Sequence, residues 1–150
     1  MAFNVLVTDP AGNTLTTASP IIDVMPASAV ITATNLIPGA AAAGDLVVSN
    51  VGGVDVFYTL TADWFPTGST TYSAATRLAN ELIVSVTTGT TDLFTGALAG
   101  LVDQPASPGQ ALTVATGFNS VHVEVLLPLS AEPSYEGIDL GFDLVFVGLT

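Results

Sequence analysis

Residues 45–63 read DLVVSNVGGVDVFYTLTAD, and this stretch gives the strongest indication of fold in the chain. Two runs rich in β-branched and aromatic residues, Asp45–Asn50 and Val54–Asp63, flank the segment Val51-Gly52-Gly53. Such runs are typical of β-strands, and glycine accepts the positive φ angles that tight turns need. The stretch therefore predicts two strands joined by a hairpin.

Runs of the same kind recur along the rest of the chain, separated by Gly, Pro, Asn, Asp and Ser. They are Phe3–Thr8, Ile21–Met25, Ala29–Asn35, Glu81–Thr87, Ala111–Val114, Ser120–Leu127 and Asp139–Leu149. Short helices are predicted at Ala74–Asn80 and Thr95–Leu101, where Ala, Leu and Gly replace β-branched residues. Eight or nine strands in 150 residues predict an all-β fold, a jelly-roll β-sandwich of two antiparallel sheets with one or two short helices.

The charge of the chain excludes several classes of partner. Thirteen residues are acidic and a single one, Arg77, is basic, which gives a formal net charge of −12. Nucleic acids and anionic lipid headgroups are held mainly by Lys and Arg, so we expect neither as a partner. No run of about 18 apolar residues occurs, so we also expect no membrane span.

Composition indicates a folded, exported domain. Hydrophobic residues make up 49% of the chain, enough to bury one core, and cysteine is absent, so disulfides contribute nothing. Residues 1–8 do not have the pattern of a secretory signal, which leaves a removed signal or a cytoplasmic location open. Because lysine is absent while Thr, Ala, Ser and Gly are abundant, we expect a secreted, extracellular or cell-surface protein.

Catalytic motifs are missing from the sequence, and we expect no enzyme. A helical zinc site needs two histidines one turn apart, whereas His122 is the single histidine. Glu124 shares a strand face with His122, a pair better explained as an outward-facing one. No Gly-x-Ser-x-Gly turn occurs, and no carboxylate pair stands out. We expect no cofactor, although the acidic loops leave calcium binding open.

Seven short blocks occur in order from Ala29 to the C-terminus. They are Asn35–Gly39, Val47–Gly52, Leu78–Leu82, Asp92–Leu98, Val125–Pro128, Tyr135–Gly137 and Phe142–Phe146. In order and spacing these blocks resemble the TasA and camelysin family of secreted β-sandwich proteins, which is similar to archaeal bundling pilus subunits. The chain departs from the family pattern in lacking lysine and in carrying Ala40 and Glu136 at positions where the family has an acidic residue and Gln.

The resemblance implies a jelly-roll domain that polymerises by donor-strand complementation. In that scheme residues 1–14 form a donor segment and residues 15–150 form the single jelly-roll domain. Phe3, Val5 and Val7 alternate with the more mixed set that includes Leu6, so an extended strand presents one apolar face. The turn residues at Asp9–Asn13 separate this strand from the rest. The alternative is that Phe3–Thr8 is the first strand of its own sandwich.

The leading hypothesis is a structural subunit of a pilus-like or biofilm-matrix filament, a head-to-tail homopolymer with Phe3, Val5, Leu6 and Val7 at the subunit interface. Arg77 is a candidate for an intersubunit or buried salt bridge, the alternative being a solvated side chain. The acidic surface favours lateral bundling of filaments when acid or divalent cations reduce the charge. Two alternatives stay open, a monomeric carbohydrate- or surface-binding module that uses Trp64, Phe65 and Tyr72, and a camelysin-like metallopeptidase.

Overall fold

The computed structural model describes residues 2–8, 22–27, 31–33, 36–131 and 133–150, and for residues 2–8 and 32–33 it describes the backbone. The strands in these ranges are β1 (Ala2–Thr8), β2 (Ile22–Met25), β3 (Ile31–Ala33), β4 (Ala41–Asn50), β5 (Val56–Pro66), β6 (Ile83–Thr88), β7 (Thr91–Ala97), β8 (Gln110–Leu112), β9 (Phe118–Leu126) and β10 (Asp139–Leu149). The helical elements are α1 (Tyr72–Glu81) and the 3-10 turns η2 (Leu98–Gly100) and η3 (Pro133–Tyr135).

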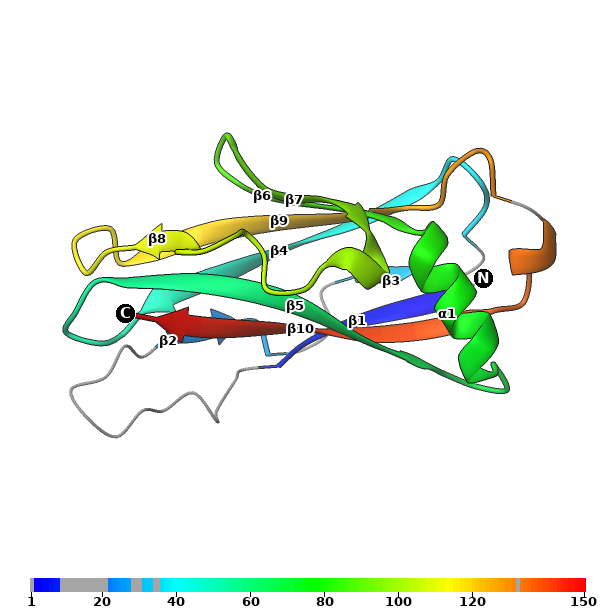
Figure 1. Cartoon of the computed structure of the whole chain (residues 1–150), viewed down its shortest axis with the longest axis horizontal. Helices are drawn as coiled ribbons and strands as arrows, with labels where there is room; N and C mark the ends of the chain where they lie inside the picture. Colours follow the sequence, from blue (N-terminus) through cyan, green and yellow to red (C-terminus); the bar gives the residue numbers. More distant parts are fainter. Residues whose placement is uncertain (1, 9–21, 28–30, 34–35, 132) are drawn as a thin grey trace.

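The strands form two five-stranded sheets that face each other, as Figure 1 shows. One sheet has the order β3-β1-β10-β5-β8 and the other the order β2-β4-β9-β6-β7. Neighbouring strands are antiparallel everywhere except at β1 and β10, which run parallel. The predicted all-β sandwich is confirmed, and the parallel pair is the exception to the prediction of antiparallel sheets.

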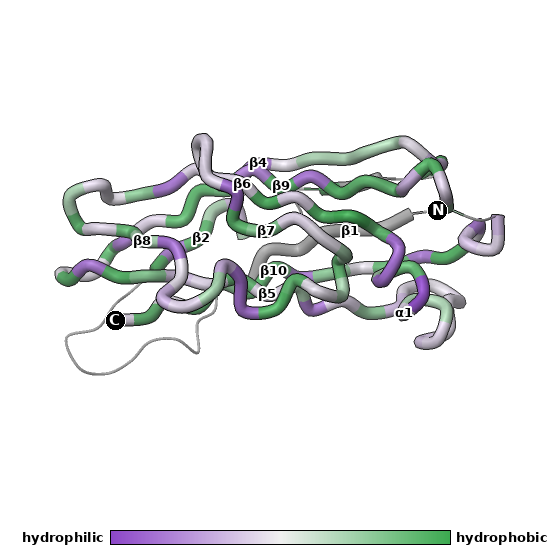
Figure 2. Tube along the Cα trace, turned by 45° about the horizontal axis from the view of Figure 1, so that its top comes forward, coloured by the Kyte–Doolittle hydropathy of each residue, from purple (hydrophilic) through white to green (hydrophobic). Residues whose placement is uncertain are grey.

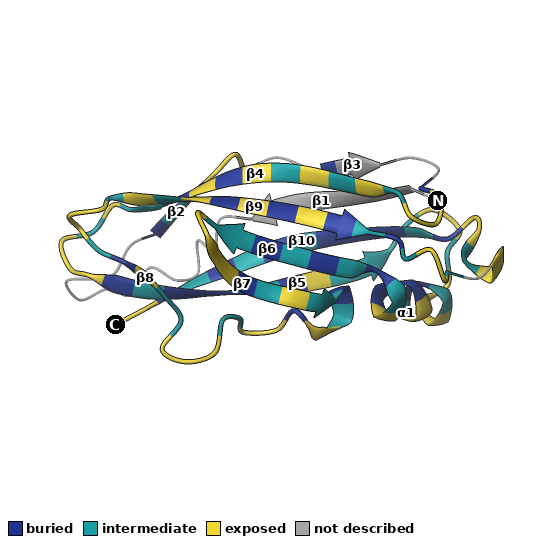
Figure 3. Ribbon diagram, turned by 90° about the horizontal axis from the view of Figure 1, so that it is seen from above, coloured by how far each residue is buried: buried dark blue, intermediate teal, exposed yellow. Residues whose placement is uncertain are grey.

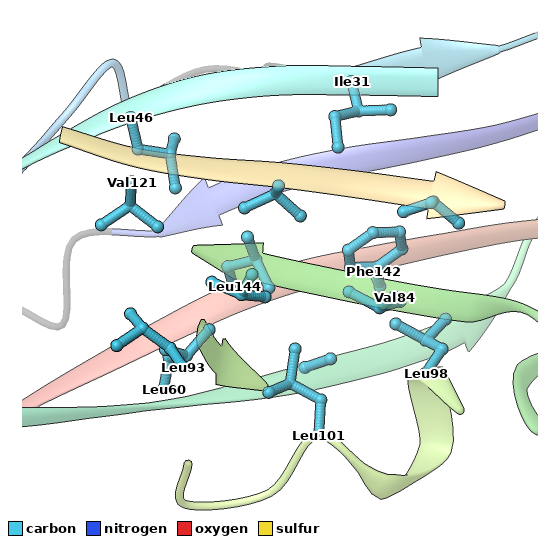
Figure 4. Packing of buried hydrophobic residues seen from close by; sticks show 14 of the residues in the cluster. Ile31, Leu46, Leu60, Val84, Leu93, Leu98, Leu101, Val121, Phe142 and Leu144 are labelled. Atoms are coloured by element: carbon cyan, nitrogen blue, oxygen red, sulfur yellow. The ribbon is translucent and has the colours of Figure 1, made fainter. Parts of the chain in front are cut away.

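The core lies between the sheets because inward and outward residues alternate along each strand. In β9, Val121, Val123 and Val125 are fully buried, whereas the intervening His122 and Glu124 are exposed. Figure 3 shows this alternation of burial along β4 and β9, and Figure 2 shows the matching alternation of hydropathy. Side chains from both sheets meet in the space between them (Figure 4). The period of two read from the sequence therefore matches the observed burial.

Helix α1 covers one end of the sandwich and confirms the helix predicted at Ala74–Asn80. Its first turn is capped by Thr71, whose hydroxyl oxygen accepts a hydrogen bond of 3.2 Å from the backbone N–H of Ala74. Ala75, Leu78 and Ala79 form its buried face. These residues recur at helical spacing, so one apolar stripe packs against β5 and η2.

Two local predictions were wrong, a helix and a hairpin. The predicted helix at Thr95–Leu101 is strand β7 up to Ala97, and the helical part is the short η2. The preceding Thr91–Phe94 pairs with β6 and carries the chain on as a strand, which short-range propensity did not reveal. The predicted strands at Ile21–Met25 and Ala29–Asn35 begin or end in residues outside the described ranges, as do the turn residues Asp9–Asn13.

The predicted hairpin at Val51-Gly52-Gly53 was also wrong, because β4 and β5 lie in different sheets. The Asn50 side chain explains why the chain crosses from one sheet to the other between β4 and β5. Its Oδ1 accepts from the N–H of Gly52 at 3.0 Å, and its Nδ2 donates to the carbonyl oxygens of Val54 at 2.8 Å and Leu112 at 3.1 Å. These bonds turn the chain and tie it to the end of β8, so the connection passes from one sheet to the other.

Candidate functional site

The strand pairing has a nested pattern that β1 interrupts. Strands β6 and β7 pair as neighbours in sequence, β5 pairs with β8 around them, and β4 pairs with β9 around those. Continued outward, the series would pair β3 with β10, but these two strands are not bonded to each other. Strand β1 lies between these two, parallel to β10 and antiparallel to β3. The N-terminal strand therefore occupies a place that the other strands leave open.

The register of β1 places its predicted apolar set beside core residues of β10. Phe3 is opposite Leu140, Val5 opposite Phe142 and Val7 opposite Leu144. These three residues of β10 are fully buried, and Phe142 and Leu144 lie among the side chains between the sheets in Figure 4. Leu6, by contrast, is opposite Asp143. The side chains of Phe3, Val5, Leu6 and Val7 lie outside what the structure describes, so their predicted contacts stay predictions.

Without β1, strand β10 has an open edge. β1 pairs with β10 along its whole length, from Ala2 opposite Asp139 to Thr8 opposite Val145. On its other side it pairs with only three residues of β3. Backbone N–H and C=O groups at an uncovered edge are ready to pair with another strand. In this structure β1 of the same chain fills the place between β3 and β10, which we call the groove of β1.

Strand β1 ends near the place where β2 begins. Gly148, close to the end of β10, lies so near Ile22 that an added Cβ would stand 3.3 Å from Ile22 Cγ2. Thr8 is opposite Val145 in the same part of β10. The two described ends of the connection 9–21, Thr8 and Ile22, therefore both lie beside the second half of β10 (Figure 1).

A carboxylate pair that sequence reasoning missed lies next to the groove. Asp63 of β5 and Asp143 of β10 are directly opposite each other. Oδ1 of Asp143 is buried and accepts no hydrogen bond from the described residues. Burial first, and then the negative charge of Asp63, raises the pKa of Asp143. Both acids lie in mid-strand, where an acidic residue is unusual, and that position was the available signal.

The Asp63–Asp143 pair predicts a dependence of stability on pH. Because the pKa of Asp143 is higher in the folded chain than in the unfolded chain, protonation favours folding. This contribution grows as the pH falls from neutral through the raised pKa, and it is complete below the unfolded value of about 3.9. We expect Asp143→Asn to be more stable than the natural chain at neutral pH and to match it near that lower limit.

Urea denaturation at a series of pH values checks this expectation. The Asp63→Asn variant removes the repulsion but not the burial, so it should show part of the effect. Asp23→Asn, on the edge strand β2 of the other sheet, serves as the control and should keep the pH dependence of the natural chain. An Asp143→Asn variant with the pH dependence of the natural chain would contradict the assignment.

Arg77 lies on α1, exposed, at the end of the sandwich where η3 is found. Its Nη2 donates to the carbonyl oxygen of Ser134 at 3.1 Å, and its guanidinium carbon lies 5.4 Å from the centre of the Tyr135 ring. Within the described ranges, no carboxylate forms an ion pair with it. A buried salt bridge within the chain is therefore not seen among these residues, and the intersubunit bridge stays a prediction.

The remaining candidates do not form a reactive arrangement in the described part of the chain. Nδ1 of His122 and Oδ1 of Asp45 are 2.7 Å apart on an exposed sheet face. No group of three His, Cys, Asp or Glu side chains in the described residues is close enough to hold a metal ion. The Trp64 and Tyr72 rings stack at 5.4 Å, with Tyr72 exposed. Of the candidate sites, the groove of β1 is the best defined in the described part of the chain.

Comparison with known proteins adds no assignment. No protein-family model matches the chain, and no curated protein is significantly similar to it. The resemblance to the TasA and camelysin family therefore rests on the blocks of sequence alone. Among the described residues, no helix has the length and apolar character needed to cross a membrane.

Proposed function

We propose that the protein is a structural subunit of an extracellular filament in which β1 of one copy completes the sheet of the next. The observation that carries the proposal is the position of β1 between β3 and β10. When β1 and β2 are set aside, the remaining orders are β3-β10-β5-β8 and β4-β9-β6-β7. Six of these strands form three nested pairs, β4 with β9, β5 with β8 and β6 with β7. β3 and β10 stand on either side of β1, where a fourth pair would form, which supports a jelly roll with β1 as an inserted strand.

The connection after β1 is long enough for exchange between copies. When β1 occupies its own groove, residues 9–21 join two points beside the second half of β10. When β1 occupies the groove of a neighbour stacked in the same direction, the connection must bridge about one sandwich length. The 11-residue strand β10 is about 37 Å long, and thirteen extended residues reach about 43–47 Å. Exchange is therefore compatible with the length of the chain.

The energetics of exchange depend on contacts outside the groove. β1 makes the same pairing with β10 and β3 whether it belongs to the same chain or to a neighbour, as in domain swapping. Strand exchange by itself is therefore close to neutral in free energy. A durable filament needs further contacts between subunits, and these decide whether the closed monomer or the polymer is favoured. A head-to-tail exchange of this kind continues into a filament unless the subunits form a closed ring.

A disulfide placed across the groove tests the proposal. Asn4 of β1 is directly opposite Thr32 of β3, and the chain has no cysteine of its own. We expect Asn4→Cys/Thr32→Cys, oxidised as a monomer, to be locked closed and unable to form filaments until it is reduced. Oxidised after assembly, the same variant should form disulfides between copies, visible as a ladder on a non-reducing gel.

The matched controls are the two single-cysteine variants. Each keeps the natural groove, so each should assemble, and neither can link every subunit to the next. Filaments whose subunits are cross-linked only within each chain would contradict strand exchange. So would normal assembly, seen by negative-stain electron microscopy, of a monomer that is fully locked.

A further inference from the structure

Exposed aliphatic side chains gather at the two ends of the sandwich. At the end where β4 stops and β5 starts, Val51, Val54 and Val114 are 57%, 38% and 46% exposed. We refer to these three residues as the valine end. At the opposite end, before β4 and after β9, Ile37 and Leu129 are 66% and 84% exposed, and we refer to them as the leucine end. Figure 1 places the corresponding loops at opposite ends of the long axis.

Hydrogen bonds hold the loops of the valine end together. Nδ2 of Asn50 donates to the carbonyl oxygens of Val54, in the loop after β4, and of Leu112, the last residue of β8. The N–H of Val114, in the loop after β8, donates to Oδ1 of Asp55 at 2.8 Å, a second link between these two segments. The three valines are therefore presented on a surface that is already ordered, and docking on it costs little conformational entropy.

The leucine end is tied in the same way. The N–H of Gly39 donates to the carbonyl oxygen of Leu127 at 2.7 Å, and the N–H of Leu127 donates to that of Ala40 at 3.0 Å. Leu129 lies against Gly39, where a Cβ would stand 2.7 Å from Leu129 Cδ2 and where φ is +87°. Leu129 thus lies beside the Gly39 turn and keeps most of its side chain at the surface of the molecule.

Charge limits which surfaces two copies can bring together. The chain carries a net charge of −12, which keeps copies apart over most of the surface. The end loops 36–40, 50–54, 113–117 and 127–131 contain no charged residue. Asp55 and Glu132 follow directly after two of them, and Asp55 already accepts the Val114 bond. The two ends are thus places where apolar surface is exposed without a charge among the residues that form it.

We infer that the valine end of one copy docks on the leucine end of the next copy. The inference rests on the proposed head-to-tail filament and gives the additional contacts that strand exchange requires. The occupant is a second copy of the chain, because each molecule carries both ends and because a neutral apolar contact suits two bodies of the same high charge. The contact also brings the Thr8 end of β1 toward the next subunit (Figure 1).

Cross-linking of two full-length single-cysteine variants tests the contact. Val54→Cys and Leu129→Cys, made in the cysteine-free chain and mixed in equal amounts under assembly conditions, are treated with a short bismaleimide. One variant carries an isotope label, so that mass spectrometry distinguishes the mixed dimer from the two like dimers. We expect the mixed dimer in excess over its statistical share. The control pairs Val54→Cys with Val102→Cys, because Val102 is 51% exposed and precedes Asp103, whose N–H bonds to Thr61 in the middle of β5.

A second variant measures the contribution of the contact. We expect Val51→Ser/Val54→Ser/Val114→Ser to raise the lowest concentration that gives filaments at least about tenfold. Circular dichroism checks that the variant remains folded. Mixed dimers no more abundant than in the control pair, while the natural chain forms filaments, would overturn the end contact and leave strand exchange intact. Mixed dimers in excess, from a chain that gives no covalent ladder in the Asn4/Thr32 experiment, would overturn strand exchange and support the end contact.

Discussion

A chain that lacks residues 1–10 is expected to lose most of its stable structure and to recover it when a peptide of residues 2–8 is added. Removing β1 leaves β10 without a neighbour on one side and uncovers Leu140, Phe142 and Leu144. Burial of each of these three large apolar side chains contributes roughly 1.5–3 kcal/mol to the free energy of unfolding. A loss of this size is comparable to the whole free energy of unfolding of a domain, about 5–15 kcal/mol.

Circular dichroism during a peptide titration measures the recovery. Two peptide variants give a matched comparison. Val5→Asp places a charge opposite the buried Phe142 and should abolish the recovery, whereas Leu6→Asn, opposite Asp143, should largely retain it. A truncated chain as stable as the full one, or equal rescue by both variants, would show that β1 does not fill a specific groove.

The second large effect is expected from Phe142→Ala. Phe142 is fully buried, between Val5 of β1 and Trp64 of β5 in the register of the sheet. Replacing a buried Phe by Ala leaves a cavity, and we expect the free energy of unfolding to fall by about 3–5 kcal/mol. Urea denaturation of the full-length chain measures the change.

Val145→Ala is the matched control for Phe142→Ala, because Val145 lies on the outward side of the same strand and is partly exposed. Its cost should stay below about 1 kcal/mol. We also expect Phe142→Ala to weaken recovery by the β1 peptide, since the cavity lies beneath the groove. Equal costs for the two variants would mean that the core does not lie on the face of β10 described here.

The sequence predicted the strands well where alternation was strong. Asp139–Leu149 was predicted with the bounds that β10 has, because four large apolar residues alternate with smaller or polar ones over its length. It also predicted a strand at Phe3–Thr8, which lies within β1. Sheet membership could not be predicted in the same way. A Gly-Gly segment permits a turn within one sheet or a crossing between two, and the bond of Asn50 to Leu112 of β8, 62 positions away, decides between them.

The features of the site that escaped prediction depend on contacts between distant segments. That β1 runs parallel to β10, with β3 on its other side, follows from pairing across most of the chain length. Asp63 and Asp143 are also far apart in sequence, and although each is unusual in mid-strand, only the register shows that they lie opposite each other. Local periodicity predicts which side of a strand a residue occupies, but not which strand lies beside it.

The parallel pairing of β1 with β10 has a consequence for growth of the proposed polymer. Every subunit has one groove and one strand, and both run in the same direction along the sandwich. A polymer built from them is polar, with a vacant groove at one tip and an unused strand at the other. The closed monomer described here has neither a vacant groove nor an unused strand, so it would act as a dormant storage form. Elongation would then be limited by how often a monomer releases its own strand, and a short β1 peptide would act as a cap for one tip only.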